Sequence, residues 1–196
     1  MSAIAPEDVA RAAFYGLLAR LFYAPADAAL LAALAGAGPL PGDDDDAALA
    51  VAWRDLGRAA ATASPDAVVE EYESVFVGTG KAEVSLYTSA YTVKSAIDNP
   101  LVEIRDFMDR KGLIRKADAF EPEDHFASVC EIMRVLVAEQ QSTLEEQQAF
   151  FENYVGPGGL LLCDAIDRSA RTVFYRHAGN LARAFLTLEQ SSLDMH

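Results

Sequence analysis

The sequence predicts an all-α protein, a single compact bundle of about nine or ten helices. Apolar residues recur at the three- and four-residue spacing of a helix through almost the whole chain, and good helix formers fill the positions between them. We find no segment with the alternating pattern of a strand, and no fixed period typical of a repeat array. With 196 residues, 52% of them hydrophobic, the chain is long enough to bury a core. We therefore expect one domain over residues 1–196.

The first helix is expected at about residues 6–23, and Pro25 stops it. Its apolar side chains follow two lines, which indicates a central, well-buried helix. The two lines are Val9, Ala13 and Leu17, and Phe14, Leu18 and Leu21. A second short helix is expected at about 26–36, and residues 36–46 are expected to form a loop. The four aspartates Asp43 to Asp46 in this loop are interpreted as a solvated turn and helix cap, in preference to a metal site.

Two further helices are expected before a glycine-rich break. The third is marked by the apolar residues Leu49, Trp53, Leu56 and Ala60. Ser64 and Pro65 then predict the cap and first turn of a fourth helix, which reaches about Phe76. The Gly78-Thr79-Gly80 stretch breaks that helix.

The remaining helices are expected at about residues 85–98, 100–111, 143–155, 158–168 and 170–189. Asn99 and Pro100 supply a cap and a first-position proline for one of them, and Gly112 ends it. Pro122 is interpreted as the start of another helix, with acids in its first turn. Two core lines are predicted, one of Phe126, Val129, Cys130, Met133, Leu136 and Val137, and one of Phe174, His177, Leu181, Phe185 and Leu188.

Charge and hydropathy limit the classes of function. Lys and Arg number 16 against 30 Asp and Glu, a formal net charge of -14, so nucleic acid would be repelled and a basic partner attracted. The same charge also suits a protein that it only keeps soluble. The first eight residues lack the basic start of a secretion signal, and the longest uncharged apolar run, 28–40, is shorter than the roughly 20 residues of a membrane span. We expect a cytoplasmic protein without stable membrane insertion.

No metal, cofactor or catalytic residue is expected. None of the three His residues stands three positions after a Glu, which excludes the Glu-x-x-His pattern of di-iron bundles. The stretch ending in Lys81 lacks both the earlier glycine and the following Ser or Thr of a phosphate-binding loop. Cys130 and Cys163 form neither a CxxC pair nor a zinc site and are expected to be buried thiols.

Two clusters of residues stand out from this background. The first contains Tyr72, Phe76 and Gly78, followed by residues 86–91 with two more tyrosines, although the four-residue spacing of Tyr72 and Phe76 also suits core packing. The second is residues 121–125, Glu-Pro-Glu-Asp-His. A helix start explains its proline and acids but not His125, because a charged imidazole there would oppose the helix dipole. A neutral His held by local hydrogen bonds, or one that meets a partner's group, fits better.

These residues resemble the TorD/DmsD family of cytoplasmic chaperones for molybdenum-containing redox enzymes, which is related to the NarJ group. The resemblance rests on three motifs in the family's order: Tyr-x-x-x-Phe-x-Gly at 72–78, Ser-x-Tyr at 89–91 and Glu-Pro-x-Asp-His at 121–125. The sequence departs from the pattern at residues 84–87, where many relatives place prolines before the aromatic residue. That departure concerns the identity of the client more than the fold.

The resemblance implies a TorD-like all-α fold with a hinge-like segment near residues 112–125, and a chaperone that is not an enzyme. Such chaperones bind the twin-arginine leader of a molybdopterin-containing oxidoreductase precursor and hold the precursor until cofactor insertion and export or assembly. The expected partners are therefore this leader and its precursor, and the expected state is a monomer or a dimer that swaps helices about the hinge. The peptide-binding residues that the resemblance implies are Tyr72, Phe76, Gly78, Ser89, Tyr91, Glu121, Pro122, Asp124 and His125.

A twin-arginine leader is a basic segment followed by an apolar one, so its receptor needs an apolar groove beside carboxylates. Two sets of side chains are expected there, the apolar Tyr72, Phe76 and Tyr91 and the acidic Glu121, Glu123 and Asp124. His125 is expected to fix the geometry of the groove. Two other functions fit the same residues: an assembly factor that recognises the mature enzyme surface, and a hydrolase that uses Asp124 and His125 to activate water.

Overall fold

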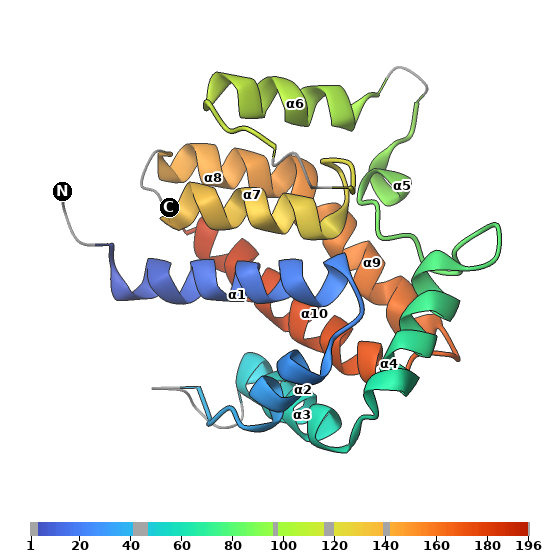
Figure 1. The fold of residues 1–196 in the computed structure, drawn as a ribbon. Coiled ribbons are helices and arrows are strands. Elements are labelled where there is room, and N and C mark those ends of the chain that lie inside the picture. Colours follow the sequence, from blue (N-terminus) through green and yellow to red (C-terminus); the bar gives the residue numbers. More distant parts are fainter. Residues whose placement is uncertain (1–3, 41–46, 96–97, 116–119, 139–141, 196) are drawn as a thin grey trace. The chain divides into compact units, whose positions relative to one another are not determined.

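The computed structural model describes residues 4–40, 47–95, 98–115, 120–138 and 142–195, and within them the chain is helical without a strand (Figure 1). The predicted all-α class is confirmed. Two π-helical segments, η1 and η2, directly follow α4 and α8. The elements are α1 (Pro6–Tyr23), α2 (Ala28–Ala35), α3 (Ala48–Thr62), α4 (Pro65–Tyr72), η1 (Glu73–Val77), α5 (Ser89–Thr92), α6 (Pro100–Arg110), α7 (Phe126–Ala138), α8 (Leu144–Phe150), η2 (Phe151–Val155), α9 (Gly156–Arg168) and α10 (Phe174–Leu193).

Helix boundaries follow the predicted caps in several places. Asn99 accepts a hydrogen bond from the backbone N–H of Val102, so α6 begins as expected. Gly112 ends α6 with a φ of 66°, and the N–H groups of Gly112 and Leu113 donate to the carbonyls of Asp109 and Met108 at 3.1 and 2.9 Å. This is the Schellman arrangement that a glycine in the left-handed region permits.

Three predicted helices are wrong in extent. The last one, expected at about residues 170–189, runs from Phe174 to Leu193. The helix expected from Ser85 is reduced to the four residues of α5, because residues 86–88 form backbone hydrogen bonds with residues 124–126. The helix expected to open at Pro122 begins at Phe126, so its first turn contains no acidic residue. Residues 122–125 form a turn in which the N–H of His125 donates to the carbonyl of Pro122 at 3.1 Å.

The predicted burial also needs correction at both ends of the chain. In α1, Val9 is 54% exposed and Ala13 is exposed, so this helix buries one face and not two. In α10, Leu188 is exposed and His177 partly exposed, because the buried face near the end of the helix passes through Leu186, Glu189 and Leu193. The core line predicted for α7 is confirmed at every position. Asp43 to Asp46 lie outside the described residues.

The chain divides into two compact units, each formed by segments that are distant in the sequence. Unit 1 consists of Met1–Tyr23, Leu86–Gly158 and Leu193–His196, and unit 2 of Ala24–Ser85 and Gly159–Ser192. The single domain expected over residues 1–196 stays a prediction. None of the helices in the described part of the chain is long and apolar enough to cross a membrane.

Unit 1 is organised around α7, which packs along α1 and also contacts α8 and η2 (Figure 1). The rings of Phe22 and Phe126 meet edge to face at 5.3 Å between centroids at one end of the α1 and α7 pair. The helix α6 is attached through the ring of Phe107, 4.8 Å from that of Phe150, and through an ion pair between Lys111 and Glu146.

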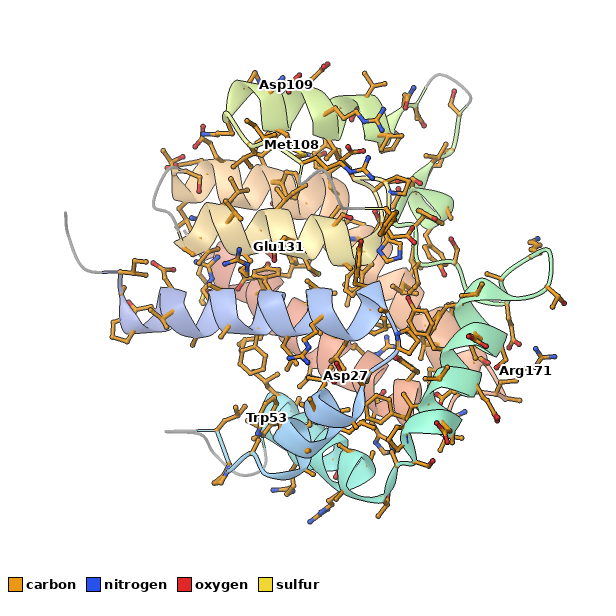
Figure 2. The ribbon with its side chains drawn as sticks, in the orientation of Figure 1. Asp27, Trp53, Met108, Asp109, Glu131 and Arg171 are labelled. Carbon is orange, nitrogen blue, oxygen red and sulfur yellow. The ribbon has the colours of Figure 1, made fainter. Side chains whose placement is uncertain are left out.

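Unit 2 contains a cluster of three buried aromatic rings. Tyr72 and Phe76 lie 5.2 Å apart, and each lies within 5.4 Å of Tyr175 on α10. The hydroxyl of Tyr175 accepts a hydrogen bond from the N–H of Ala26 at 3.0 Å, and burial raises the pKa of Tyr175. Elsewhere in this unit, Asp27 caps α2 and the indole N–H of Trp53 donates to the carbonyl of Gly38 at 2.9 Å (Figure 2).

The two cysteines are free and buried, as predicted. Burial raises the pKa of the Cys163 thiol to about 12. A thiol with such a pKa is almost entirely protonated at neutral pH, so it is a poor nucleophile and a poor metal ligand.

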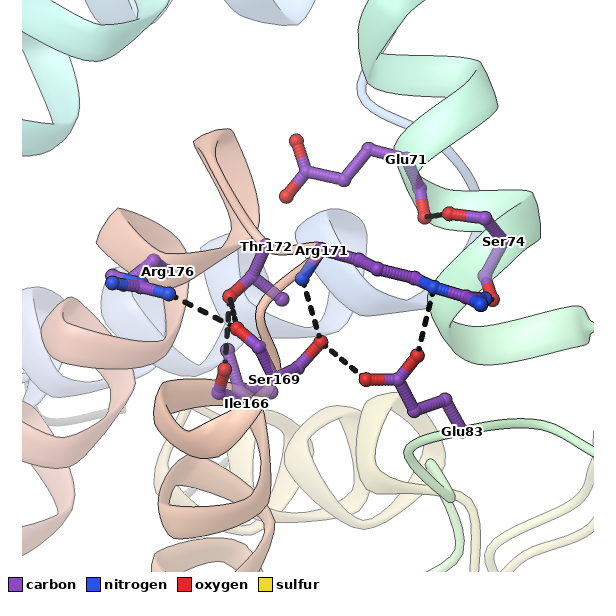
Figure 3. Close-up of polar contacts among 8 residues, drawn as sticks. All are labelled: Glu71, Ser74, Glu83, Ile166, Ser169, Arg171, Thr172 and Arg176. Carbon is purple, nitrogen blue, oxygen red and sulfur yellow. Dashed lines mark hydrogen bonds and ion pairs between the residues drawn. The ribbon is translucent and has the colours of Figure 1, made fainter.

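The start of α10 is fixed by the carboxylate of Glu71. This carboxylate accepts hydrogen bonds from the backbone N–H groups of Val173, Phe174 and Tyr175 at 2.8 to 2.9 Å. A neighbouring network joins the loop before α10 to the segment that follows η1, also in unit 2 (Figure 3): the hydroxyl of Ser169 donates to Glu83 at 2.6 Å, and Arg171 pairs with the same carboxylate. Glu71 therefore acts as a helix cap from a distant part of the sequence.

We expect Glu71→Ala to lower the free energy of unfolding by about 1–3 kcal/mol, because three N–H groups at the start of α10 lose their acceptor. The neighbouring Glu70 is exposed and provides a matched control. Urea unfolding monitored by circular dichroism should place Glu70→Ala within about 0.5 kcal/mol of the original protein. Equal effects of the two substitutions would show that the capping bonds of Glu71 contribute nothing specific.

Candidate functional site

The turn before α7 is held by backbone pairing with the segment before α5. Tyr87 and His125 form an isolated antiparallel bridge. The N–H of Thr88 donates to the carbonyl of Asp124 at 2.9 Å, and the N–H of Phe126 donates to the carbonyl of Leu86 at 2.7 Å. These bonds join the residues just before the Ser-x-Tyr motif to the Glu-Pro-x-Asp-His motif within unit 1 and determine where α7 begins.

Asp124 is directed into this pairing. Its side chain is buried, and Oδ2 accepts a hydrogen bond from the hydroxyl of Ser89 at the start of α5. The hydroxyl of Thr88 donates to the carbonyl of the same aspartate at 3.1 Å. Gly158 approaches this point so closely that a Cβ there would lie 2.6 Å from the Thr88 side chain. Ser89 and Asp124 therefore hold the two segments together, a contact that the sequence did not predict.

His125 caps α7. The imidazole is 2% exposed, and its Nδ1 accepts a hydrogen bond from the N–H of Ala127 at 3.2 Å. An Nδ1 that accepts from an N–H carries no proton, so the ring is neutral with its proton on Nε2. Burial lowers the pKa of His125, while the negative charges of Glu121 and Asp124 oppose that shift. The structure thus agrees with the prediction of a neutral His held by local hydrogen bonds.

The capping role of His125 predicts a loss of stability in mild acid. The unfolded imidazole has a pKa near 6.5, and the folded one is lowered. As the pH falls below 6.5, the imidazole of the unfolded state binds a proton while that of the folded state stays neutral. The free energy of unfolding therefore decreases with falling pH until the pH lies below the pKa of the folded state. We expect His125→Asn, which keeps a capping acceptor without titrating, to flatten this decrease between about pH 7.5 and about pH 5.

The check is urea unfolding of both proteins at several pH values across that range. Carboxylates titrate in both proteins, so the difference between the two curves isolates the histidine. Parallel curves would contradict a neutral, capping His125.

Glu121 and Tyr87 lie at the surface beside this turn. The hydroxyl of Tyr87 donates to Oε2 of Glu121 at 2.9 Å, and the Tyr87 ring stands edge to face on His125 at 5.4 Å. Burial, followed by the hydrogen bond to Glu121, raises the pKa of Tyr87. Pro122, between the two acids of the motif, is partly exposed.

Glu123 is buried, at 7% exposed. Its carboxylate lies 3.0 Å from the guanidinium of Arg105 on α6 and 3.6 Å from that of Arg115. Two arginines of the chain therefore already neutralise this carboxylate, which ties α6 and the segment after it to the turn.

A groove of about 990 Å³ runs beside the turn within unit 1. Its walls are α1, α7 and the segment that follows α6. Its lining is mostly apolar or small, with carboxylates and guanidinium groups among the apolar side chains. The lining residues are Gly16, Ala19, Arg20, Tyr23, Met108, Gly112, Leu113, Ile114, Arg115, Phe120, Glu121, Glu123, Ala127, Ser128, Glu131, Ile132, Arg134 and Val135.

The predicted site residues divide between the two units. Ser89, Tyr91, Glu121, Pro122, Asp124 and His125 belong to unit 1, and Tyr72, Phe76 and Gly78 belong to unit 2. Tyr72 and Phe76 are each 7% exposed and pack on Tyr175. Tyr91 is partly exposed on α5. That the two groups bind one peptide stays a prediction.

Most of the groove was not predicted. Its floor uses small residues of α1 and α7, such as Gly16, Ala19 and Ala127, which carry no chemical signal in a sequence rich in alanine. Glu131 and Arg134 read as an ordinary helical pair. Of the predicted acids, Glu121 and Glu123 line the groove and Asp124 does not.

Gly78 ends η1, and both its backbone conformation and the space around it require a glycine. Its φ is 66°, and a Cβ there would lie 2.4 Å from the carbonyl oxygen of Lys81. Gly112 has the same φ but nothing within 4 Å of its Cβ position. The motif glycine is therefore needed both for its backbone conformation and for space.

We expect Gly112→Ala to lower the free energy of unfolding by about 1–2 kcal/mol through backbone strain alone. Gly78→Ala should cost about 1–2 kcal/mol more, because the clash with Lys81 adds to the same strain. Chemical unfolding of both variants measures the difference. Equal losses would indicate that the chain near Lys81 relaxes without cost.

The comparison with protein-family models matches residues 42–157 to the family described as nitrate reductase delta subunit. The match covers more than half of the chain, and the chain belongs to this family. It is a family of chaperones and assembly factors for molybdoenzymes, not of catalysts, and it includes the TorD and NarJ type of protein that the sequence resembles. The comparison with curated proteins gave no match.

Proposed function

We propose that this protein binds the twin-arginine leader of a molybdopterin-containing oxidoreductase precursor in the groove of unit 1. It holds the precursor in the cytoplasm until the cofactor has been inserted and the enzyme is exported or assembled. The single observation that carries the proposal is the groove itself, a largely apolar trough beside the Glu121 to His125 turn whose lining also includes three carboxylates and three guanidinium groups.

The shape and chemistry of the groove suit a leader with a basic and an apolar part. Met108, Leu113, Ile132 and Val135 offer apolar contacts for the hydrophobic part of a leader. Glu121 and Glu131 offer carboxylates for the arginines. Exposed ion pairs contribute only about 0.2–1 kcal/mol each, so the apolar contacts should supply most of the affinity and the carboxylates the specificity.

His125 and Asp124 support this role indirectly. The cap at His125 and the bond from Ser89 to Asp124 fix the start of α7, which forms one wall of the groove. Both side chains are buried and committed to these bonds. A hydrolase in which they activate water would need them to face a substrate, so we do not propose that function.

The test is titration of the purified protein with a fluorescent twin-arginine leader peptide from a molybdoenzyme precursor. We expect the Arg-Arg peptide to bind about tenfold more tightly than its Lys-Lys version, because only a guanidinium forms two parallel hydrogen bonds with one carboxylate. A scrambled peptide of equal charge and hydropathy is the control. If the leader binds no better than the scrambled peptide, the proposal is wrong.

A second function deserves a test because of two side chains at the rim of the groove. Ile114 is 91% exposed and Phe120 is 86% exposed, and exposed apolar surface of this kind is typical of protein contact sites. Such side chains suit an assembly factor that contacts the surface of the mature enzyme. Binding of the client with and without its leader separates the two functions, since an assembly factor of this kind would retain its affinity for the shortened client.

A further inference from the structure

Three carboxylates line the groove, and their surroundings differ. Glu123 has a side chain only 9% exposed and contacts two arginines of the chain. Glu121 and Glu131 lie nearer the solvent, the former accepting a bond from Tyr87 and the latter 44% exposed. Removing a partner from a buried, doubly paired carboxylate has a large free-energy cost, whereas an exposed carboxylate changes partners at little cost.

Glu131 forms a bidentate pair with a guanidinium group of the chain itself. Nε and a terminal nitrogen of Arg134 donate to its two carboxylate oxygens at 2.8 and 2.7 Å. Both residues belong to α7, and Glu131 lies on the side of this helix that faces α1 (Figure 2). The stem of Arg134 crosses to α1, where a Cβ at Gly16 would lie 3.0 Å from its Cδ.

From this arrangement, and on the basis of the proposed function, we infer that Glu131 and Glu121 are the carboxylates that select arginine in the leader. Arg134 occupies Glu131 in the free protein and yields it to the guanidinium of the client. The exchange replaces one bidentate pair by another, and the original pair is half exposed, so the carboxylate is never left buried without a partner.

Two separate carboxylates also suit two consecutive arginines. Successive side chains of an extended peptide point to opposite sides, so one carboxylate cannot serve both arginines. Glu121 comes from the turn before α7 and Glu131 from the second turn within it, and both line the same groove. A lysine forms no bidentate pair, which makes Glu131 a determinant of arginine over lysine.

The experiment measures the affinity of Arg-Arg and Lys-Lys leader peptides for Glu131→Gln, Glu121→Gln and a charge-matched control. Glu152 serves as control because it is exposed, belongs to unit 1 and does not line the groove. We expect each groove substitution to weaken the Arg-Arg peptide by about threefold, as the loss of one exposed ion pair allows, and the Lys-Lys peptide much less, so that the preference for arginine decreases with each substitution. Glu152→Gln should stay within about twofold of the original protein, since distant surface charge is screened.

The exchange also predicts that one substitution raises the affinity for the Arg-Arg peptide. Arg134→Met keeps an apolar stem beside Gly16 but removes the competing guanidinium, so the Arg-Arg peptide should bind about two- to threefold more tightly. Thermal unfolding confirms that each variant is folded before its affinity is compared.

The outcomes separate this inference from the function on which it rests. If the original protein does not prefer the leader over a scrambled peptide, the proposed function itself fails. If it does prefer the leader, but Glu131→Gln and Glu121→Gln bind both peptides as Glu152→Gln does, only the assignment of the two carboxylates is overturned. Weaker binding by a folded Arg134→Met variant would overturn the exchange.

Discussion

The structure of the groove depends on the backbone pairing between residues 86–89 and 122–126. A helix leaves its first N–H groups without partners, and α7 resolves this with the imidazole of His125 and the carbonyl of Leu86. Because the bonded groups are buried, a slip of one residue would leave several of them without partners, at about 1–3 kcal/mol each. The pairing therefore permits one start for α7, and with it one position for the wall of the groove.

The same pairing gives each acidic side chain of the motif a different environment. The turn directs Asp124 to the hydroxyl of Ser89 and Glu123 to two arginines, while Glu121 stays at the surface with Tyr87. Asp124 and Glu123 thus stabilise the turn, and only Glu121 keeps a carboxylate that solvent or a ligand reaches. The motif forms one acidic cluster in the sequence, but its carboxylates have different structural roles.

Sequence reasoning predicted the helical class, most helix ends and the core line of α7, because caps, glycines and apolar spacing are local signals. It placed the start of α7 at Pro122, since a proline followed by acids is typical of a first turn. The hydrogen bonds that move this start to Phe126 come from residues 86–88, and a pairing across that separation leaves no local pattern. The predicted acids Glu121 and Glu123 do line the groove. The floor of the groove and the position of Glu131 in it result from the packing of α1 along α7, and the sequence of one helix does not show how it packs on another.

Half-exposed carboxylates suit a protein that must release what it holds. A buried carboxylate paired with a client arginine would gain much on binding, but it would be left charged and unsolvated when the client departed. In the proposed exchange, Arg134 restores a bidentate pair at Glu131 when the client leaves, so that binding and release differ by one guanidinium replaced by another. The ionic contacts then contribute selectivity for arginine with little net affinity, and the apolar contacts determine how long the client stays.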